Sequence, residues 1–325
     1  VQKEEKGYKL AWEDSLIFPG LLPTDKVRVS TVPAKRGEIL DRNGRVLAGA
    51  GVAASVGIVP GNLEDREEAI RQAAGLLGMD PEDIEKKLSA KWVKENSFVP
   101  IKNLRKVQEV ELMALEPDPE AQAEHGRQQQ LLQIPGVMIS DTEVRAYPLG
   151  EAAAHLVGYV QNVTAEDLEQ HSGEGYTANS VIGRSGAEGL FEKELKGQDG
   201  CRIFLTDAKG QEKMELANRT VEHGASIKLT VDAELQMDLY GQFQEDKSCS
   251  VALDPYTGEV LALVSTPSYD SNDFILGLSS EQWAALNEDE NKPMYNRFRQ
   301  AWCPGSTFKS VIGAIGLDSG AFGAG

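Results

Sequence analysis

The sequence predicts an α+β protein of two or three domains. Its 325 residues are too many for one average domain, and a composition of 41% hydrophobic and 26% charged residues is typical of folded proteins. Alternating apolar patterns that end in hairpin turns indicate strands, and they are interleaved with segments of helical periodicity. No internal repeat of fixed period is present.

Strands are expected at several places along the chain. Val27, Val29 and Thr31 alternate with polar residues, and Asn43-Gly44 between two apolar runs predicts a hairpin whose two central residues have positive φ. A second hairpin is expected over 248–270, with its turn at 254–258. Further strand patterns cover 134–150, 202–206 and 226–231.

Helical periodicity first appears over 62–90, where two helices are expected. Asn62 should cap the first, and Asp80-Pro81 should start the second. The polar stretch 105–131 predicts a helix and an exposed, mobile loop. Shorter helices are expected within 151–157, 164–170, 186–197 and 232–245.

Charge and residue usage exclude several classes of function. A net charge of −18 repels nucleic acid and anionic lipid, so no nucleic-acid partner is expected. No apolar run reaches 18 residues, and no signal-peptide pattern opens the chain. Three scattered cysteines and four histidines without ligand spacing predict neither a metal site nor another cofactor.

Ser306 and Lys309 are the candidate catalytic residues. If Pro304-Gly305 opens a helix, Lys309 lies one turn after Ser306 on the same face and can take the proton of its hydroxyl. The helix start adds backbone N–H groups near developing negative charge. The apolar continuation 310–317 predicts a helix that runs through a core. The alternative is an ordinary surface serine and lysine.

Longer motifs support the catalytic interpretation. The stretch NRFRQAWCPGSTFKSVIGAIGLDSG (296–320) closely resembles the active-site segment of penicillin-binding proteins, the D,D-transpeptidases that crosslink peptidoglycan. RGEILDRNGRVLA (36–48) is similar to the motif that opens their non-catalytic dimerisation or pedestal domain, and later landmarks follow in order. Cys303 departs from the family pattern and places a free thiol near the serine.

The resemblance implies a domain organisation. Residues 1–30 look like the end of a nuclear-transport-factor-like domain and its linker, as in class B proteins of the low-affinity, methicillin-resistance type. A β-rich, elongated pedestal would follow over 31–232, with a helical insertion at about 62–131. The first part of an α/β transpeptidase domain resembling the penicilloyl-serine transferases would occupy 233–325.

The resemblance also implies the chemistry. Ser306 would be the nucleophile and Lys309 the general base, forming an acyl-serine with D-Ala-D-Ala stem peptides or with β-lactams. Structural roles are expected for a second group: Arg36, Gly37, Asp41, Arg42, Gly44 and Glu188. Asp41 and Arg42 should tie the first hairpin to the interdomain linker, Glu188 should pair with Arg184 or Arg36, and His155 should satisfy a local hydrogen bond.

Two further family motifs, Ser-x-Asn and Lys-Thr-Gly, do not occur in the sequence, so its substrate-binding residues remain unassigned. We therefore expect a chain truncated after the Ser-x-x-Lys motif, with an unstable or rearranged catalytic part and negligible activity of its own. The full protein is expected on the outer face of a bacterial plasma membrane, anchored upstream of Val1.

Two alternatives of other classes remain. The chain could serve as a non-catalytic pedestal that binds other cell-wall synthesis proteins, which the missing motifs favour for the fragment. It could also be a penicillin-sensing receptor or a β-lactamase, but the long region before Ser306 argues against that class.

Overall fold

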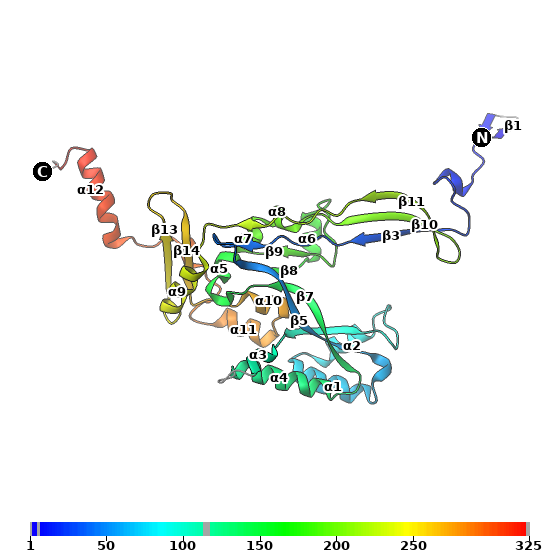
Figure 1. Ribbon diagram of the computed structural model, residues 1–325, viewed down its shortest axis with the longest axis horizontal. Coiled ribbons are helices and arrows are strands. Elements are labelled where there is room, and N and C mark those ends of the chain that lie inside the picture. Colours follow the sequence, from blue (N-terminus) through cyan, green and yellow to red (C-terminus); the bar gives the residue numbers. More distant parts are fainter. Residues whose placement is uncertain (1, 5–6, 113–117, 323–325) are drawn as a thin grey trace.

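The computed structural model describes residues 2–4, 7–112 and 118–322. Figure 1 shows an elongated molecule whose two ends lie far apart, with most of the chain gathered between them. The mixture of helices and strands confirms the α+β class. Within the described ranges, none of the helices combines the length and the apolar character that spanning a bilayer requires.

The central sheet is organised around one long strand, β5 (Val46–Ile58). It pairs with β4 (Ile39–Leu40), β6 (Val99–Arg105) and β7 (Val137–Ala146), and the short strand β12 (Ile227–Lys228) lies parallel to β4. β7 follows β5 without interruption, from Gly49 opposite Ala146 to Ile58 opposite Val137. Of the strand expected over 226–231, only β12 forms.

The hairpin between β4 and β5 is confirmed, but its turn differs from the expectation. Gly44 has a φ of 86°, whereas Asn43 does not have a positive φ. The buried Asp41 carboxylate accepts hydrogen bonds from the backbone N–H groups of Asn43 at 2.7 Å and Arg45 at 2.8 Å. An aspartate side chain thus closes the turn, so only one left-handed residue is needed.

A helical lobe is inserted between β5 and β7. It contains α1 (Arg66–Leu77), α2 (Pro81–Leu88), α3 (Glu109–Leu112) and α4 (Pro119–Leu132). The apolar faces of α1, α2 and α4 pack on the sheet around Ile58 and Val99. α2 starts after Asp80, as expected. The cap of α1 is Asp65, which accepts from the Glu68 N–H, and not Asn62. Part of the expected mobile loop, 113–117, lies outside the described residues.

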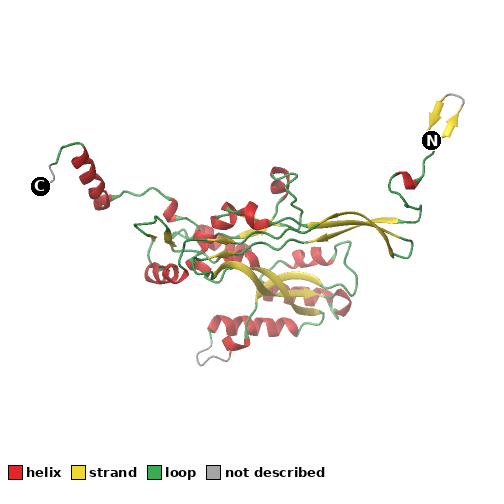
Figure 2. Ribbon diagram, turned by 45° about the horizontal axis from the view of Figure 1, so that its top comes forward, coloured by secondary structure: helices red, strands yellow, loops and turns green. Residues whose placement is uncertain are grey.

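A three-stranded ribbon projects from the body toward the N-terminal end (Figures 1 and 2). It consists of β11 (Glu212–Arg219), β10 (Gly200–Thr206) and β3 (Lys26–Val32), and beyond it β1 (Gln2–Glu4) pairs with β2 (Gly7–Lys9). β3 and β10 were expected, whereas β11 was not. Its polar sequence shows no alternation because nearly every position of the strand is exposed.

Short elements link the sheet to the ribbon and to the last third of the chain. They are α5 (Ala154–Val157), β8 (Val160–Asn162), α6 (Ala165–Gln170), β9 (Val181–Gly183), α7 (Gly186–Leu190) and α8 (Glu192–Lys196). The helix that runs into a strand at 151–160 is confirmed. The helix expected over 186–197 forms as two, which meet at Phe191.

The last third begins with α9 (Ala233–Phe243), followed by the expected hairpin of β13 (Ser248–Leu253) and β14 (Val260–Thr266). The buried side chain of Gln236 joins α9 to this hairpin, because its amide donates to Leu263 O and accepts from Leu263 N. It also donates to Ala152 O at 2.7 Å. α10 (Ser271–Leu276) and α11 (Ser280–Glu288) follow.

One buried carboxylate joins three distant segments of the region that the resemblance assigns to the pedestal. Glu188 on α7 has no exposed surface, and its two oxygens accept from Arg36 Nε at 2.8 Å and Arg145 Nε at 2.7 Å. Arg145 also donates to Gly37 O, and Tyr147 donates its hydroxyl to Glu188. Burial, and then the charge of Glu188, raises the pKa of Tyr147 far above its usual range.

A second carboxylate completes this ion-pair network. Glu192 on α8 accepts from Arg36 Nη2 at 2.6 Å and from the Gly183 N–H at 2.9 Å, so β9 is also tied in. Two arginines therefore meet two glutamates, and the network carries no excess charge. A buried ion pair lasts only when its remaining donors and acceptors are satisfied. Here nearly all of them are, Arg145 Nη2 excepted.

α10 docks the last third of the chain onto the rest of the body. Phe274 stacks on Tyr159 with ring centroids 3.9 Å apart, and Tyr269 meets His155 edge to face at 5.1 Å. Polar bonds fix the same contact, because Ser271 Oγ donates to Gly158 O at 2.8 Å. The contact combines aromatic burial with satisfied polar groups, which is typical of a rigid interface.

His155 lies inside this contact. Its Nε2 bonds to the Pro293 carbonyl at 2.8 Å, which is a distant partner in the sequence and not the local one expected. Burial lowers the pKa of His155 to about 4; the bond to Pro293 opposes this shift and the charge of Arg297 adds to it. His155 is thus neutral in the folded protein at neutral pH, with Nε2–H donating.

Replacing Glu188 by Gln should destabilise the protein strongly, because Arg36 and Arg145 would keep their buried charges with one carboxylate fewer. We expect a loss of about 3–5 kcal/mol, measured by urea unfolding followed by circular dichroism. Glu234→Gln is the control, since it breaks the exposed pair with Arg45 and should cost at most about 1 kcal/mol. Equal losses in the two variants would contradict this account of the network.

The stability of the protein should fall as the pH drops from about 6.5 toward 4. Unfolded His155 takes up a proton near its ordinary pKa of 6.5, whereas folded His155 resists protonation down to about 4. Its contribution is therefore complete above pH 6.5 and lost in that window, by about 2–3 kcal/mol at pH 4.5. His155→Gln keeps a donor for Pro293 O and should remove this part of the pH dependence of urea unfolding. The same substitution at the exposed His223 should leave it intact.

Candidate functional site

Ser306 and Lys309 lie at the start of the last helix. Residues 305–308 form the 3₁₀ turn η5, and α12 (Lys309–Asp318) continues directly from it. The Lys309 N–H donates to Ser306 O, so the two residues stand one turn apart, as the sequence indicates. No hydrogen bond joins the Ser306 hydroxyl to the Lys309 amine in the described part of the chain.

The surroundings of α12 differ from the expectation. The helix extends away from the body (Figures 1 and 2), and both Ser306 and Lys309 are exposed. Its apolar side chains are also exposed, by 51% at Ile312 and 58% at Ile315. The expectation that this helix runs through a core is therefore wrong for this chain, because no described element covers its apolar face.

The segment that leads to Ser306 is held at Arg297 in the 3₁₀ turn η4 (Arg297–Arg299). Arg297 is 6% exposed, and its guanidinium donates to the carbonyls of Asn291, Lys292 and Tyr295. Trp302 Nε1 donates to Arg297 O at 2.8 Å. The chain is thus anchored beside β14 shortly before Pro304 and the serine.

Asp41 and Arg42 bring the first hairpin against the start of the last third. The Asp41 carboxylate accepts from the Ala233 N–H at the beginning of α9. Burial opposes its ionisation, but the hydrogen bonds from Arg45, Ala233 and Asn43 outweigh burial and lower its pKa. Arg42 pairs with Glu259 at 3.2 Å, and its N–H donates to Val231 O.

Gly37 is required by close packing. A Cβ at this position would lie 2.0 Å from Ala225 O, so any other residue would displace the backbone next to Arg36. Gly44 supplies the left-handed residue of the hairpin turn. Asp41, Arg42 and Gly44 thus belong to the hairpin that meets the start of α9. Arg36, Gly37 and Glu188 instead belong to the buried ion-pair network and its immediate surroundings.

Glu188 contacts Arg36, one of its two expected partners, but not Arg184. Arg184 instead binds Asp167 with Nη1–Oδ1 at 2.7 Å and holds the pKa of that carboxyl well below its usual range. The second partner of Glu188 is Arg145, which the sequence did not single out. Its only signal is an arginine in a strand pattern at 134–150, beside Tyr147, and strands often carry such residues on a solvent face.

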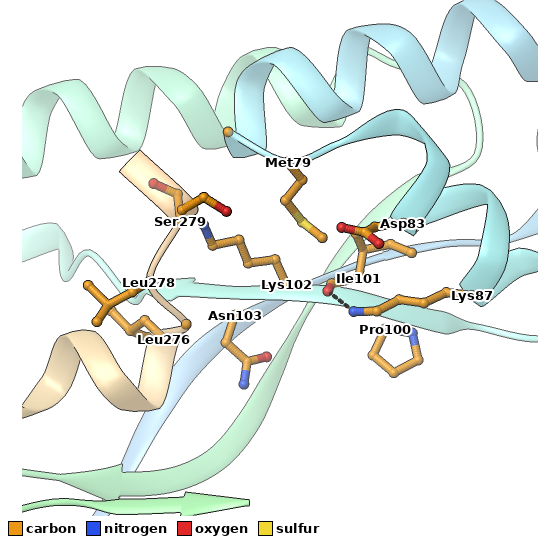
Figure 3. A pocket seen from close by; sticks show the side chains of 13 residues that line it. Met79, Asp83, Lys87, Pro100, Ile101, Lys102, Asn103, Leu276, Leu278 and Ser279 are labelled. Carbon is orange, nitrogen blue, oxygen red and sulfur yellow. Dashed lines mark hydrogen bonds between the residues drawn. The ribbon is translucent and has the colours of Figure 1, made fainter. Parts of the chain in front are cut away.

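A small cleft lies elsewhere, between the helical lobe and the turn from α10 to α11. Figure 3 shows Lys87 and Lys102 among its lining residues, with Met79 directed into a space of about 440 Å³. Lys87 donates to Ile101 O and Lys102 to Leu77 O, and burial lowers the pKa of both amines. Each amine therefore binds a backbone carbonyl at the cleft.

The described residues contain no group of three or more His, Cys, Asp or Glu side chains placed to hold a metal ion. Cys201, Cys249 and Cys303 are all free thiols, and Cys303 is exposed three residues before Ser306. The groups that the candidate site itself presents are the hydroxyl of Ser306, the amine of Lys309 and the backbone N–H groups of the helix start.

Two family models match the chain. The penicillin-binding protein dimerisation domain matches residues 31–229, and the penicillin-binding protein transpeptidase domain matches residues 248–324. Among curated proteins, penicillin-binding protein 3 of Bacillus subtilis (strain 168) is 38% identical over 98% of this chain and 45% of its own length. Peptidoglycan D,D-transpeptidase MrdA of Escherichia coli (strain K12) is 30% identical over 91% of this chain and 46% of its own.

The chain thus spans about half the length of the curated relatives it matches. A solved complex between penicillin-binding protein PBP2 and MreC from Helicobacter pylori has a TM-score of 0.63 at 24% identity, covering 90% of this chain and 52% of that one. PBP2 of the same organism alone gives a TM-score of 0.56. These structures share the fold. With a dimerisation domain followed by transpeptidase sequence, the chain belongs to the class B penicillin-binding proteins.

Proposed function

We propose that the full-length protein is a peptidoglycan D,D-transpeptidase in which Ser306 is the nucleophile and Lys309 the general base. The observation that carries the proposal is the serine and lysine one turn apart at the start of a helix, inside the region that matches the transpeptidase family. Relatives that cover most of this chain are named peptidoglycan D,D-transpeptidases.

The proposed reaction runs through an acyl-serine. Lys309 takes the proton of Ser306, whose oxygen attacks the carbonyl of the penultimate D-Ala, and the terminal D-Ala leaves with that proton. An amine of a second stem peptide then attacks the ester and regenerates the serine. β-Lactams would acylate the same oxygen, because their strained amide presents an equivalent carbonyl. The N–H groups at the start of η5 and α12 favour the developing oxyanion.

A lysine serves as a base only where burial or neighbouring positive charge keeps it partly neutral. α12 is exposed here, so the chain of 325 residues does not supply that environment. We therefore propose that the activity needs further transpeptidase sequence, which would cover the apolar face of α12 formed by Val311, Ile312 and Ile315. The chain by itself is expected to be inactive.

We also propose that the protein is of the low-affinity, methicillin-resistance type and acts on the outer face of the plasma membrane. Residues 1–30 would be the end of a nuclear-transport-factor-like domain. Their large apolar side chains support this proposal, because Tyr8 and Trp12 are 73% and 67% exposed, as expected where another domain should pack. The domain limits at residues 30 and 232 belong to the same proposal.

A second proposed role is binding of another cell-wall synthesis protein by the pedestal. A cavity of about 960 Å³ lies against β7, β8 and α10, lined by Val144, Val160 and Ile275 among others. Its volume is in the range of ligand pockets, and its lining combines apolar side chains with charged ones such as Arg36, Glu38 and Arg145. The PBP2 of H. pylori, which shares the fold, forms a complex with MreC.

Ser306→Ala in the full-length protein should abolish covalent labelling by fluorescent penicillin, read on a denaturing gel. Ser310→Ala is the matched control, since Ser310 is an exposed serine on the same helix and should leave labelling unchanged. The wild-type 325-residue chain should not label. Labelling that survives Ser306→Ala would end the assignment of the nucleophile.

Val144→Arg should weaken binding of the MreC encoded in the same genome, because the longer side chain would fill part of the cavity. We expect the dissociation constant, measured by calorimetry, to rise about tenfold or more. Val52→Arg is the control, because Val52 is exposed on neighbouring β5 and does not line the cavity. Equal affinities for the wild type and both variants would remove the cavity from the interface.

A further inference from the structure

Arg297 is a buried cation without an acidic partner. It is 6% exposed, and no carboxylate lies within ion-pair distance of it in the part of the chain that the structure describes. Its Nη1 and Nη2 instead donate to the backbone carbonyls of Asn291, Lys292 and Tyr295. The protein thus places a positive charge inside without neutralising it, although its net charge is −18.

A buried, unpaired cation destabilises the folded protein unless the groups around it compensate for its lost hydration. Burying a charge is unfavourable, and three carbonyl dipoles compensate for it only if they are held in place around the guanidinium. The planar fork of arginine suits that task, because each N–H direction is fixed. Arg297 therefore gathers residues 291–295 into one conformation.

The backbone of Arg297 connects this segment to β14 on one side and to Trp302 on the other. Its N–H donates to Ser265 Oγ on β14 at 3.0 Å, and its carbonyl accepts from Trp302 Nε1 at 2.8 Å. Among residues 303–308, the hydrogen bonds that the structure describes are local, such as Thr307 N–H to Pro304 O. The Trp302–Arg297 bond is thus the last anchor before Ser306.

We propose that Arg297 is a positioning residue for the Ser306 nucleophile. The inference rests on the proposed function: Arg297, anchored beside β14, and Trp302 fix the point from which the chain runs on to Ser306. A misplaced nucleophile slows the chemical step more than it weakens binding, because the substrate is held by other groups. Loss of Arg297 should therefore act on acylation and not on recognition.

Stopped-flow acylation of the full-length protein by a fluorescent penicillin separates the two effects. It yields the dissociation constant Kd of the initial complex and the acylation rate constant k2. Arg297→Ala should lower k2 by about 100-fold while Kd stays within about threefold. Arg297→Lys keeps the charge but loses the fork and should recover part of k2. Arg299→Ala, in the same turn but exposed, should behave like the wild type.

An Arg297→Ala variant with wild-type k2 would overturn the inference, and so would a loss that falls wholly on Kd. Should that variant fail to fold, Trp302→Phe removes the indole N–H that bonds to Arg297 O and keeps an aromatic ring at this position. Trp302 is 58% exposed, so its ring is not needed for a core. A lowered k2 in Trp302→Phe supports the inference, and a wild-type k2 overturns it. A wild type that is not labelled at Ser306 would instead defeat the proposed function.

Discussion

The ion pairs of the buried Glu188 carboxylate are the interaction on which the rest of the structure depends. The carboxylate binds Arg36 just before the first strand of the sheet and Arg145 at the end of β7, while itself lying on α7. These segments are far apart in sequence, and the sheet alone does not join all three. Because the carboxylate is fully buried, water and salt screen its interactions much less than those of a surface ion pair. The network therefore sets how α7 and α8 sit on the sheet.

A series of contacts connects this network to the candidate catalytic segment. Tyr147 bonds to Glu188 through its hydroxyl, and its backbone bonds to the side-chain amide of Asn272 on α10: the Tyr147 N–H donates to Asn272 Oδ1, and Asn272 Nδ2 donates to Tyr147 O. α10 belongs to the part that carries β14, and β14 anchors Arg297 through Ser265. A pedestal that fixes the sheet can thus fix the start of the serine helix without touching it. These contacts hold the chain as far as Arg297 and Trp302, whereas α12 itself is exposed.

Local signals allowed much of the fold to be predicted from the sequence. Asp80-Pro81, the hairpin at Asp254–Gly258 and the helix after Asp232 depend on nearby residues, and each formed as expected. The misses were non-local. β11 exists because β10 offers it a partner, and Arg145 matters because α7 brings Glu188 to it. At the candidate site, the spacing of Ser306 and Lys309 could be predicted, whereas the exposure of α12 depends on what packs against it.

Native-state hydrogen exchange of Glu188→Gln, followed by mass spectrometry, tests the central claim most directly. If one carboxylate holds the three segments together, then amides in 36–40, 145–147 and 183–195 should lose protection together and by a similar factor. The exposed-pair variant Glu234→Gln should leave all three unchanged. A loss confined to α7 and α8, with the sheet segments as protected as in the wild type, would contradict the account.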